Sequence, residues 1–401
     1  MHILSSDNRS EFLACPQLVR LDFAQGKDEF ESTLLVKGST LLLKYVIAGV
    51  NLQFILVRIK DRLVYGLRIQ DDPDKPAILW SAIEKQEEVL ALRQMCNDGR
   101  CQVFLFNELA VNVAWMEVSL APPESVLRNL IEGISLARAK NAELSDEVND
   151  TFDRLLSQGL SDSIVVPISS SSSWRKINNV LITNKITQCP IDLFQQDEGN
   201  QQEQLAIWLI DNLHPSGAFH RPQIPSGPRK RELTDVLLTY ENGSFLVESK
   251  SFSLLSRKPL PDRSRLSRAA SKDVVEAISQ LQGAIRKIRG GTEVTTPYGE
   301  VISIEREWPP HGIVLVPDLD LLSDEENYGM ELAIEFMKKT HGFLHLLDVA
   351  ELLRVVQAAE MISAAGKNVS PMMAFDYCLI ERAKKAIELR TLRFSVLFRT
   401  A

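Results

Sequence analysis

The sequence of 401 residues contains no uninterrupted apolar run that approaches the roughly 20 residues needed to span a bilayer. Its first segment, MHILSSDNRSEFLACP, also lacks the basic region followed by an apolar stretch that marks a secretion signal. Cysteine is scarce: there are only five, and their odd number and scattered positions predict reduced thiols rather than a disulfide framework. We therefore expect a cytoplasmic protein that does not interact with a membrane.

Motifs of several common enzyme classes are missing as well. The spacing of His214 and His220 matches no ordinary zinc pattern, which favours loop histidines over zinc ligands. His341 and His345 are four residues apart, but a glycine follows the first and no acidic third ligand is evident. The serine run at residues 169–173 lacks the glycine and lysine pattern of a phosphate-binding loop, so we interpret it as a flexible loop or boundary. No serine lies in a nucleophile elbow.

Positive charge is in deficit overall, because the formal net charge is −8. This balance argues against a protein that binds nucleic acid over its whole surface. Residues 225–290 are different, with thirteen Lys or Arg against seven Asp or Glu. A basic region within an acidic chain is typical of an enzyme that grips a phosphate backbone at one place, although a solvated charged surface is the alternative.

Length and hydrophobic periodicity predict three parts, since domains usually hold roughly 100–200 residues. Residues 1–121 show mainly the period of two expected for strands, over 18–23, 32–46, 51–59, 62–69, 101–107 and 109–120, with one helical insert near residues 80–95. Residues 122–190 form a helical connector with the serine-rich loop, with helices starting at Pro123 and covering about 146–156. Residues 191–401 change to alternating helices and strands.

In this last part we expect helices over 203–213, 272–288, 328–340, 348–365 and 373–388, and strands over 236–240, 244–250 and 312–318. Helix, hairpin, helix and strand in that order predict an α/β core. The fold class is therefore mixed, α+β or α/β, with a β-rich N-terminal domain followed by an α/β domain that ends in helices.

The segment RELTDVLLTYENGSFLVESK, residues 231–250, carries the chemistry. Asn242-Gly243 between two strand patterns predicts a two-residue type I′ turn, which needs positive φ at both positions. The register that follows pairs Glu241 with Ser244, and therefore Asp235 with Lys250. Side chains alternate along a strand, so Asp235, Glu248 and Lys250 share one face.

Two carboxylates and an amine on one face suit phosphodiester hydrolysis. Mg²⁺ held by one or two carboxylates neutralises developing negative charge and lowers the pKa of a bound water. A lysine can orient that water or stabilise the charged phosphorus centre. For Asp235 and Lys250 alone, the alternative is an ordinary surface ion pair worth about 0–1 kcal/mol.

At these residues the sequence resembles the PD-(D/E)XK nuclease superfamily, whose motif is matched by Asp235 followed by Glu248-Ser249-Lys250. Its members often carry a glutamate on the preceding helix, here matched by Glu203, for which Glu198 is a competitor, and a glutamine on the following helix, here Gln280. The segment RELTD departs from the strict Pro-Asp form. The resemblance covers about residues 195–320 and implies a restriction-endonuclease-like fold.

The resemblance also implies residue roles. Asp235, Glu248 and Glu203 would hold Mg²⁺, with Mn²⁺ as an alternative, and Lys250 and Gln280 would complete the catalytic set. The basic residues nearest the motif are candidates for nucleic-acid binding: Arg229, Lys230, Arg231, Arg257 and Lys258. The stretch SRKPLPDRSRLSR, residues 256–268, is expected to be a mobile loop, whether it closes over a phosphate backbone or is merely disordered.

The function expected from this resemblance is hydrolysis of DNA phosphodiester bonds by an endonuclease, in bacterial defence against phage or foreign DNA, or in repair. DNA is favoured over RNA as the partner. A scaffold or sensor that keeps the fold without catalysis is the main alternative, and a protein partner of the N-terminal domain that licenses cleavage is another. Cutting both strands needs two active sites, so a homodimer also fits.

Overall fold

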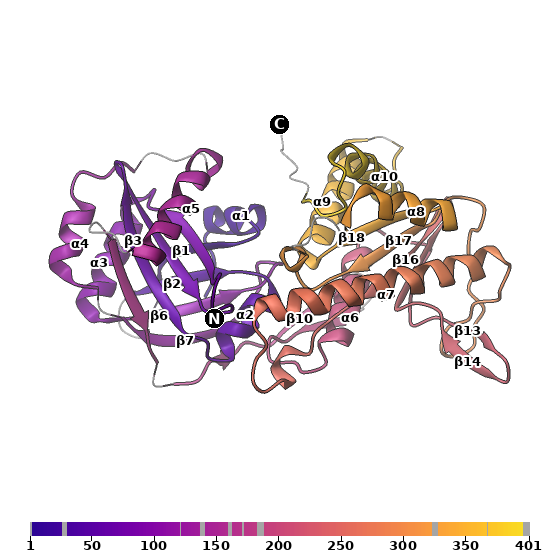
Figure 1. Ribbon diagram of the computed structural model, residues 1–401, viewed down its shortest axis with the longest axis horizontal. Helices are drawn as coiled ribbons and strands as arrows, with labels where there is room; N and C mark the ends of the chain where they lie inside the picture. The colour runs from indigo at the N-terminus through magenta and orange to yellow at the C-terminus, as the bar shows by residue number, and fades with distance from the viewer. Residues whose placement is uncertain are drawn as a thin grey trace. The chain divides into compact units, whose positions relative to one another are not determined.

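The computed structural model describes residues 2–25, 30–120, 122–136, 141–158, 163–170, 172–182, 188–322, 328–366 and 368–395. The chain divides into two compact units, each with helices and sheets (Figure 1). Unit 1 comprises Met1–Asn179 and Asp192–Phe194, and unit 2 comprises Val180–Ile191 and Gln195–Ala401. The mixed α and β class predicted from the sequence is confirmed. Within these described ranges, no helix is long and apolar enough to cross a membrane.

Unit 1 contains a five-stranded sheet in the order β1-β2-β6-β7-β9 and a four-stranded sheet in the order β5-β4-β3-β8. The strands are β1 (Leu18–Gln25), β2 (Phe30–Lys37), β3 (Leu52–Ile59), β4 (Arg62–Ile69), β5 (Ala77–Ala82), β6 (Arg100–Phe106), β7 (Asn112–Ser119), β8 (Ser163–Ile168) and β9 (Arg175–Lys176). The helices are α1 (Ser6–Ala14), α2 (Thr40–Ile47), α3 (Gln86–Asp98), α4 (Glu124–Ile131) and α5 (Asn141–Gln158).

Two expectations for this unit were wrong in detail. Residues 32–46 are not one strand: β2 ends at Lys37, and α2 follows because the Ser39 hydroxyl caps it by accepting from the Leu42 N–H at 3.2 Å. The helical insert does not include Trp80, which lies in β5. That helix, α3, begins only at Gln86, where the Glu88 carboxylate accepts the Lys85 N–H at 3.1 Å.

The segment expected as a connector, residues 122–190, contributes two strands to the sheets of unit 1. Strand β8 pairs with β3, and β9 pairs with β7. Helix α4 starts just after Pro123, as predicted, and buries Leu127, Leu130 and Ile131. The short strands β10 (Asn179–Ile182) and β11 (Gln188–Ile191) form a separate two-stranded sheet.

Unit 2 is built on a five-stranded sheet in the order β12-β15-β16-β17-β18. The strands are β12 (Gly217–His220), β15 (Val236–Tyr240), β16 (Gly243–Ser249), β17 (His311–Leu315) and β18 (Phe343–Leu347). The first three pair antiparallel, and β16, β17 and β18 pair parallel. A second hairpin, β13 (Gln223–Ser226) and β14 (Arg229–Glu232), forms its own two-stranded sheet.

Helices cover both faces of the central sheet. Their bounds are α6 (Glu198–Asp211), α7 (Arg263–Arg289), α8 (Met330–Thr340), α9 (Val349–Ala365) and α10 (Pro371–Leu389), with short 3₁₀ turns η1 (Leu254–Ser256) and η2 (Leu319–Leu321). The long helix α7 packs on β16 and β17 (Figure 1). On the opposite face, the Phe245 ring contacts Phe375 of α10. Burial on both faces explains why every residue of β15 is buried.

The register of the β15–β16 hairpin differs from the predicted one. Tyr240 pairs with Gly243, so Glu241 and Asn242 form the turn instead of Asn242-Gly243. Neither Asn242 nor Gly243 has the positive φ that a type I′ turn requires. Close packing explains the glycine at position 243 instead, because a Cβ there would lie 3.0 Å from the Tyr240 ring. The shift of two residues keeps each side chain on its predicted face.

The basic stretch at residues 256–268 was also predicted wrongly in part. Helix α7 already begins at Arg263, where the Asp262 carboxylate caps it by accepting from the Arg265 N–H at 2.6 Å. Arg263, Arg265 and Arg268 are therefore helical residues. Only the first part of the stretch lies before the helix.

Candidate active site

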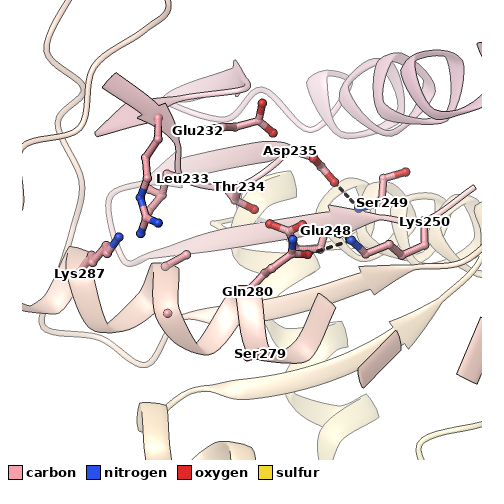
Figure 2. Close-up of a pocket in the computed structure, with 13 residues that line it drawn as sticks. Glu232, Leu233, Thr234, Asp235, Glu248, Ser249, Lys250, Ser279, Gln280 and Lys287 are labelled. Atoms are coloured by element: carbon pink, nitrogen blue, oxygen red, sulfur yellow. Dashed lines mark hydrogen bonds and ion pairs between the residues drawn. The ribbon is translucent and has the colours of Figure 1, made fainter. Parts of the chain in front are cut away.

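A cavity of about 450 Å³ lies where β15 begins and β16 ends, against the side of α7 (Figure 2). The polar residues that line it are Arg231, Glu232, Thr234, Asp235, Glu248, Ser249, Lys250, Ser279, Gln280 and Lys287. Four of the five residues predicted to be catalytic are thus brought together: Asp235, Glu248, Lys250 and Gln280. The fifth, Glu203, lies on α6 and does not line the cavity.

Asp235 and Glu248 face each other across the hairpin. Val236 pairs with Val247, and the same register continued by one residue sets Asp235 opposite Glu248 rather than opposite Lys250 as predicted. The ladder ends here, and the Ser249 N–H donates to Asp235 Oδ2 at 2.6 Å. This bond fixes one oxygen of Asp235 at the cavity wall. Glu248 is only 5% exposed.

Burial disfavours charge on both acids, and the charge of Asp235 adds to this effect on Glu248. Burial, followed by the charge of Asp235, raises the pKa of Glu248 to about 8, despite the opposing effect of Lys250. The pKa of Asp235 is also raised, chiefly by burial and against the Ser249 hydrogen bond. Two carboxyl groups that resist ionisation side by side form a site that a cation would stabilise.

Lys250 is held in a defined position between β16 and α7. Its Nζ donates to Gln280 Oε1 at 2.8 Å and lies 4.0 Å from Glu248 Oε2 (Figure 2). The carboxylate nearest to Lys250 is therefore Glu248, so the alternative of a simple Asp235–Lys250 surface pair does not describe this geometry. Gln280, the glutamine expected on the helix after the motif, therefore contacts the motif lysine.

Glu203 is engaged by two basic side chains that the sequence did not indicate. Its Oε2 lies 2.7 Å from His220 Nε2 and accepts from Arg221 Nε at 3.0 Å, and its Oε1 accepts from Arg221 Nη2 at 3.3 Å. Burial alone would raise the pKa of Glu203, but these hydrogen bonds outweigh it and lower the pKa. The competitor Glu198 lies in the first turn of α6 and is buried.

Glu232, at the end of β14, is a cavity residue that sequence reasoning missed. Its side chain is largely exposed, but partial desolvation of the carboxyl raises its pKa to about 7, reinforced by a hydrogen bond in which the protonated carboxyl donates to Asp235. Its proximity to Asp235 in RELTD was the one available signal. The signal was insufficient because β14 and β15 belong to different sheets, so strand alternation could not give the direction of the side chain.

The predicted nucleic-acid-binding residues divide into two groups. Arg231 lines the cavity, Arg229 and Lys230 lie on the same strand, and all three are exposed. Arg257 and Lys258 are exposed in the loop after η1 but do not line the cavity. Lys287 of α7, which was not predicted, adds a third cation to the lining, after Arg231 and Lys250 (Figure 2).

The donor set was compared with what a metal ion requires. In the described part of the chain, no three His, Cys, Asp or Glu side chains form a ready-made metal cage. Mg²⁺ does not need one, because it keeps several waters and is commonly bound through one or two carboxylates. Asp235 has one oxygen free of the Ser249 bond, and Glu248 lies opposite it in a polar cavity. These residues fit a hard divalent cation.

Two further sets of polar residues have structural roles. The Asp318 side chain caps η2 by accepting the Asp320 N–H at 2.8 Å. His341 ends α8, whereas His345 is buried in β18, 2.9 Å from the ring nitrogen of His311. His341 and His345 therefore do not form a metal pair.

Comparisons of the chain with protein families, with curated proteins and with solved structures gave no match. The geometry of the site consequently carries the functional argument.

Proposed function

We propose that unit 2 is a restriction-endonuclease-like domain that hydrolyses DNA phosphodiester bonds with the help of Mg²⁺, or alternatively Mn²⁺. One observation carries this proposal. Asp235 and Glu248 oppose each other in a polar cavity, and Lys250 lies within 4.0 Å of Glu248. Acids and an amine in this arrangement suit a reaction in which negative charge grows on phosphate oxygens.

The order of elements around the site supports the same class. An acid stands at the start of β15, and a Glu-x-Lys stands at the end of its neighbour β16. A glutamate lies on the helix before them, α6, and a glutamine that contacts the lysine lies on the helix after them, α7. These are the relations on which the resemblance to the PD-(D/E)XK superfamily depends.

Each side chain then has a role in the proposed reaction. Asp235 and Glu248 would hold the metal, which supplies charge neutralisation and a more acidic bound water. Lys250, held by Gln280, stabilises the charged phosphoryl oxygens or orients the attacking water. Glu232 has a pKa of about 7, so it can exchange a proton near neutral pH. Glu203 holds Arg221 and His220 in place through its carboxylate and is a further candidate ligand for the metal.

The substrate follows from the charge beside the cavity. Arg231 and Lys287 line it, and the surrounding segment carries the local excess of positive residues in an otherwise acidic chain. We propose DNA rather than RNA as the substrate because of the resemblance to the PD-(D/E)XK superfamily. The same resemblance suggests bacterial defence as the biological setting. A homodimer would supply the two sites needed to cut both strands.

The test is incubation of the purified protein with linear and supercoiled DNA, with and without Mg²⁺. We expect Mg²⁺-dependent cleavage by the wild type, and a loss of at least 100-fold in Asp235→Ala and Lys250→Met with folding intact, on the scale of a lost charge-stabilising group. Glu241→Gln is the matched control, because it removes a carboxylate from the turn of the same hairpin, outside the cavity. Equal cleavage rates for the wild type and Asp235→Ala would mean that Asp235 is not catalytic, and would favour the non-catalytic scaffold instead.

A further inference from the structure

A small arm of unit 2 lies beside the cavity, and of its residues only Arg231 and Glu232 take part in the proposed reaction. We call it the wing and define it as residues 223–232, the β13–β14 hairpin, together with residues 292–302. Gln223 joins the two segments, because its N–H donates to the Thr295 carbonyl at 2.7 Å and its carbonyl accepts from the Thr295 N–H at 2.8 Å. In Figure 1 the hairpin is set apart from the central sheet.

The wing is an ordered structure, and both of its segments bury apolar side chains. Ile224 and Val294 are each 1% exposed, and Ile302 is 4% exposed. The turn at its end is closed by the Gly299 N–H, which donates to the Thr296 carbonyl at 2.9 Å, and by the Thr296 N–H, which donates to the Glu300 carbonyl at 2.7 Å. A side chain on this turn is therefore held on a defined scaffold.

Tyr298 lies in that turn and is 94% exposed. A single exposed aromatic residue is not by itself informative, but the turn that carries this one has a cation beside it. A Cβ on the adjoining Gly299 would lie 3.9 Å from Lys230 Nζ, so the ammonium group and the aromatic turn share one surface. Arg229, also exposed, extends the basic edge along β14. An aromatic platform with flanking cations is the combination that binds single-stranded nucleic acid.

The wing leads directly into the proposed active site. Strand β14 carries Arg229 and Lys230 at its outer part and Arg231 and Glu232 at the cavity, a span of about 10 Å at roughly 3.3 Å per residue. Two residues then separate Glu232 from Asp235. A nucleic-acid strand that lies along β14 would reach the cavity without turning.

Charge alone does not make the wing a duplex-binding surface. Its three basic residues, Arg229, Lys230 and Arg231, are balanced by three acidic ones, Glu232, Glu293 and Glu300. Attraction for a phosphate backbone is therefore weak over the wing as a whole, whereas stacking on Tyr298 needs an accessible base face. The contact that distinguishes substrates is the aromatic one.

We propose that the wing binds a nucleic-acid strand with unpaired bases, that Tyr298 stacks on one of those bases, and that the preferred substrate contains single-stranded DNA next to the cleavage point. This inference rests on the proposed function for the cleavage step but not for binding. Binding by the wing needs neither the metal nor Asp235. The two proposals can therefore fail separately.

The experiment measures binding of the full chain in EDTA to three labelled oligonucleotides: a single strand, a blunt duplex, and a duplex with a single-stranded overhang. We expect Tyr298→Ala to weaken binding of the single strand and the overhang about fivefold to a hundredfold, and binding of the blunt duplex less than twofold. Tyr298→Phe is the matched control and keeps the ring. Lys230→Ala should weaken binding of all three substrates.

Several outcomes overturn the inference. The first is unchanged binding of the single strand and the overhang by Tyr298→Ala. The second is an equal loss of affinity for the blunt duplex and the single strand in this variant. The third is that the wild type binds none of the three oligonucleotides. Cleavage of the same substrates with Mg²⁺ is measured in parallel, with Asp235→Asn as the inactive reference. Tyr298-dependent binding without any cleavage would uphold the wing and refute the nuclease. Cleavage and binding that do not change in Tyr298→Ala would uphold the nuclease and refute the role of the wing.

Discussion

At the scale of single residues, the dominant feature is an acid pair that the fold forces together. Half-buried Asp235 and buried Glu248 lie opposite each other, and the Lys250 ammonium group lies 4.0 Å from the Glu248 carboxylate. The pKa of Glu248, about 8, is well above its ordinary value. In the protein without metal this pair opposes folding whenever both groups are ionised.

The first prediction concerns stability against pH in EDTA. The folded-state pKa of Glu248 is raised from its ordinary 4.5, so its contribution to stability is present at low pH and is lost as pH rises through about 8. We expect the wild-type Tm to fall between pH 5 and pH 9, and Glu248→Gln to raise the Tm at pH 9 by about 3 °C or more. Thermal unfolding with Glu241→Gln as control measures this. If Glu248→Gln had the same Tm as the wild type at pH 9, the proposed destabilisation by the ionised Glu248 would be wrong.

The second prediction concerns the metal. An ion held by Asp235 and Glu248 must displace the proton on Glu248 below pH 8, because the metal binds the charged form. Calorimetry should therefore find that Mg²⁺ affinity increases about tenfold per pH unit between pH 6 and pH 7.5, with proton release. Glu248→Gln should abolish the dependence. An affinity that is flat over this range would mean that Mg²⁺ binds elsewhere or not at all.

The third prediction separates Glu232 from Glu203. The pKa of Glu232 is raised to about 7, whereas hydrogen bonds hold the pKa of Glu203 low. In Mg²⁺-dependent cleavage, Glu232→Gln should remove an inflection of the pH–rate profile near pH 7. Glu203→Gln should leave the inflection and destabilise the protein by about 1–2 kcal/mol, because it weakens the contacts with Arg221 and His220. An unaltered profile in Glu232→Gln would exclude proton exchange by this residue.

At the scale of elements, strand alternation was a better guide than turn chemistry. The alternation of β16 predicted correctly that Glu248 and Lys250 share a face, because that property depends only on the period of two. The turn predicted from Asn242-Gly243 was wrong, because Gly243 belongs to the strand and packs against the Tyr240 ring. Short strands such as β12, β13 and β14 were not predicted, since four residues are too few for a periodic pattern.

The fourth prediction tests the face of the sheet that is remote from the cavity. Tyr240 donates a short hydrogen bond to Asp376 Oδ2, and His311 Nε2 lies 2.7 Å from Asp376 Oδ1. Tyr240→Phe deletes one partner of a partly buried carboxylate and should lower the free energy of unfolding by about 1–3 kcal/mol. Urea denaturation measures the loss. Tyr298→Phe removes an exposed hydroxyl and is the matched control.

The same variant separates stability from catalysis. Because Tyr240 packs with Phe245 and Asp376, away from α7 and the cavity, Tyr240→Phe should keep wild-type cleavage under conditions where it is folded. A loss of cleavage without a loss of stability would show that the two faces of the sheet are coupled. An unchanged urea midpoint would mean that the Tyr240 hydroxyl contributes no net stability.

At the scale of the whole molecule, the division of the chain was harder to predict than its parts. The sequence change near residue 191 was visible, because helices and strands begin to alternate there. It could not be seen that β8 and β9 return to the sheets of unit 1, because the pairing of β8 with β3 joins residues far apart in the chain. Long-range pairing of this kind leaves no local signal.

The last prediction follows from where the site residues lie. All the residues that line the cavity fall between Arg231 and Lys287, and the sheet and helices that hold them belong to unit 2. A fragment that starts at Val180 should therefore unfold in one cooperative transition, and Mg²⁺ should raise its Tm at pH 8 as it does in the full chain. Chemical and thermal denaturation with and without Mg²⁺ measure both properties.

Cleavage by this fragment then reports on unit 1. Equal rates for the fragment and the full chain would refute regulation by the N-terminal part, whereas a rate raised or abolished in a folded, Mg²⁺-stabilised fragment would support it. Asp235→Asn in the fragment is the matched control, since it removes one of the opposed carboxylates while the rest of unit 2 stays unchanged. A fragment that fails to unfold cooperatively would show that unit 2 depends on unit 1 for its stability, and the autonomy inferred from its own sheet and helices would be wrong.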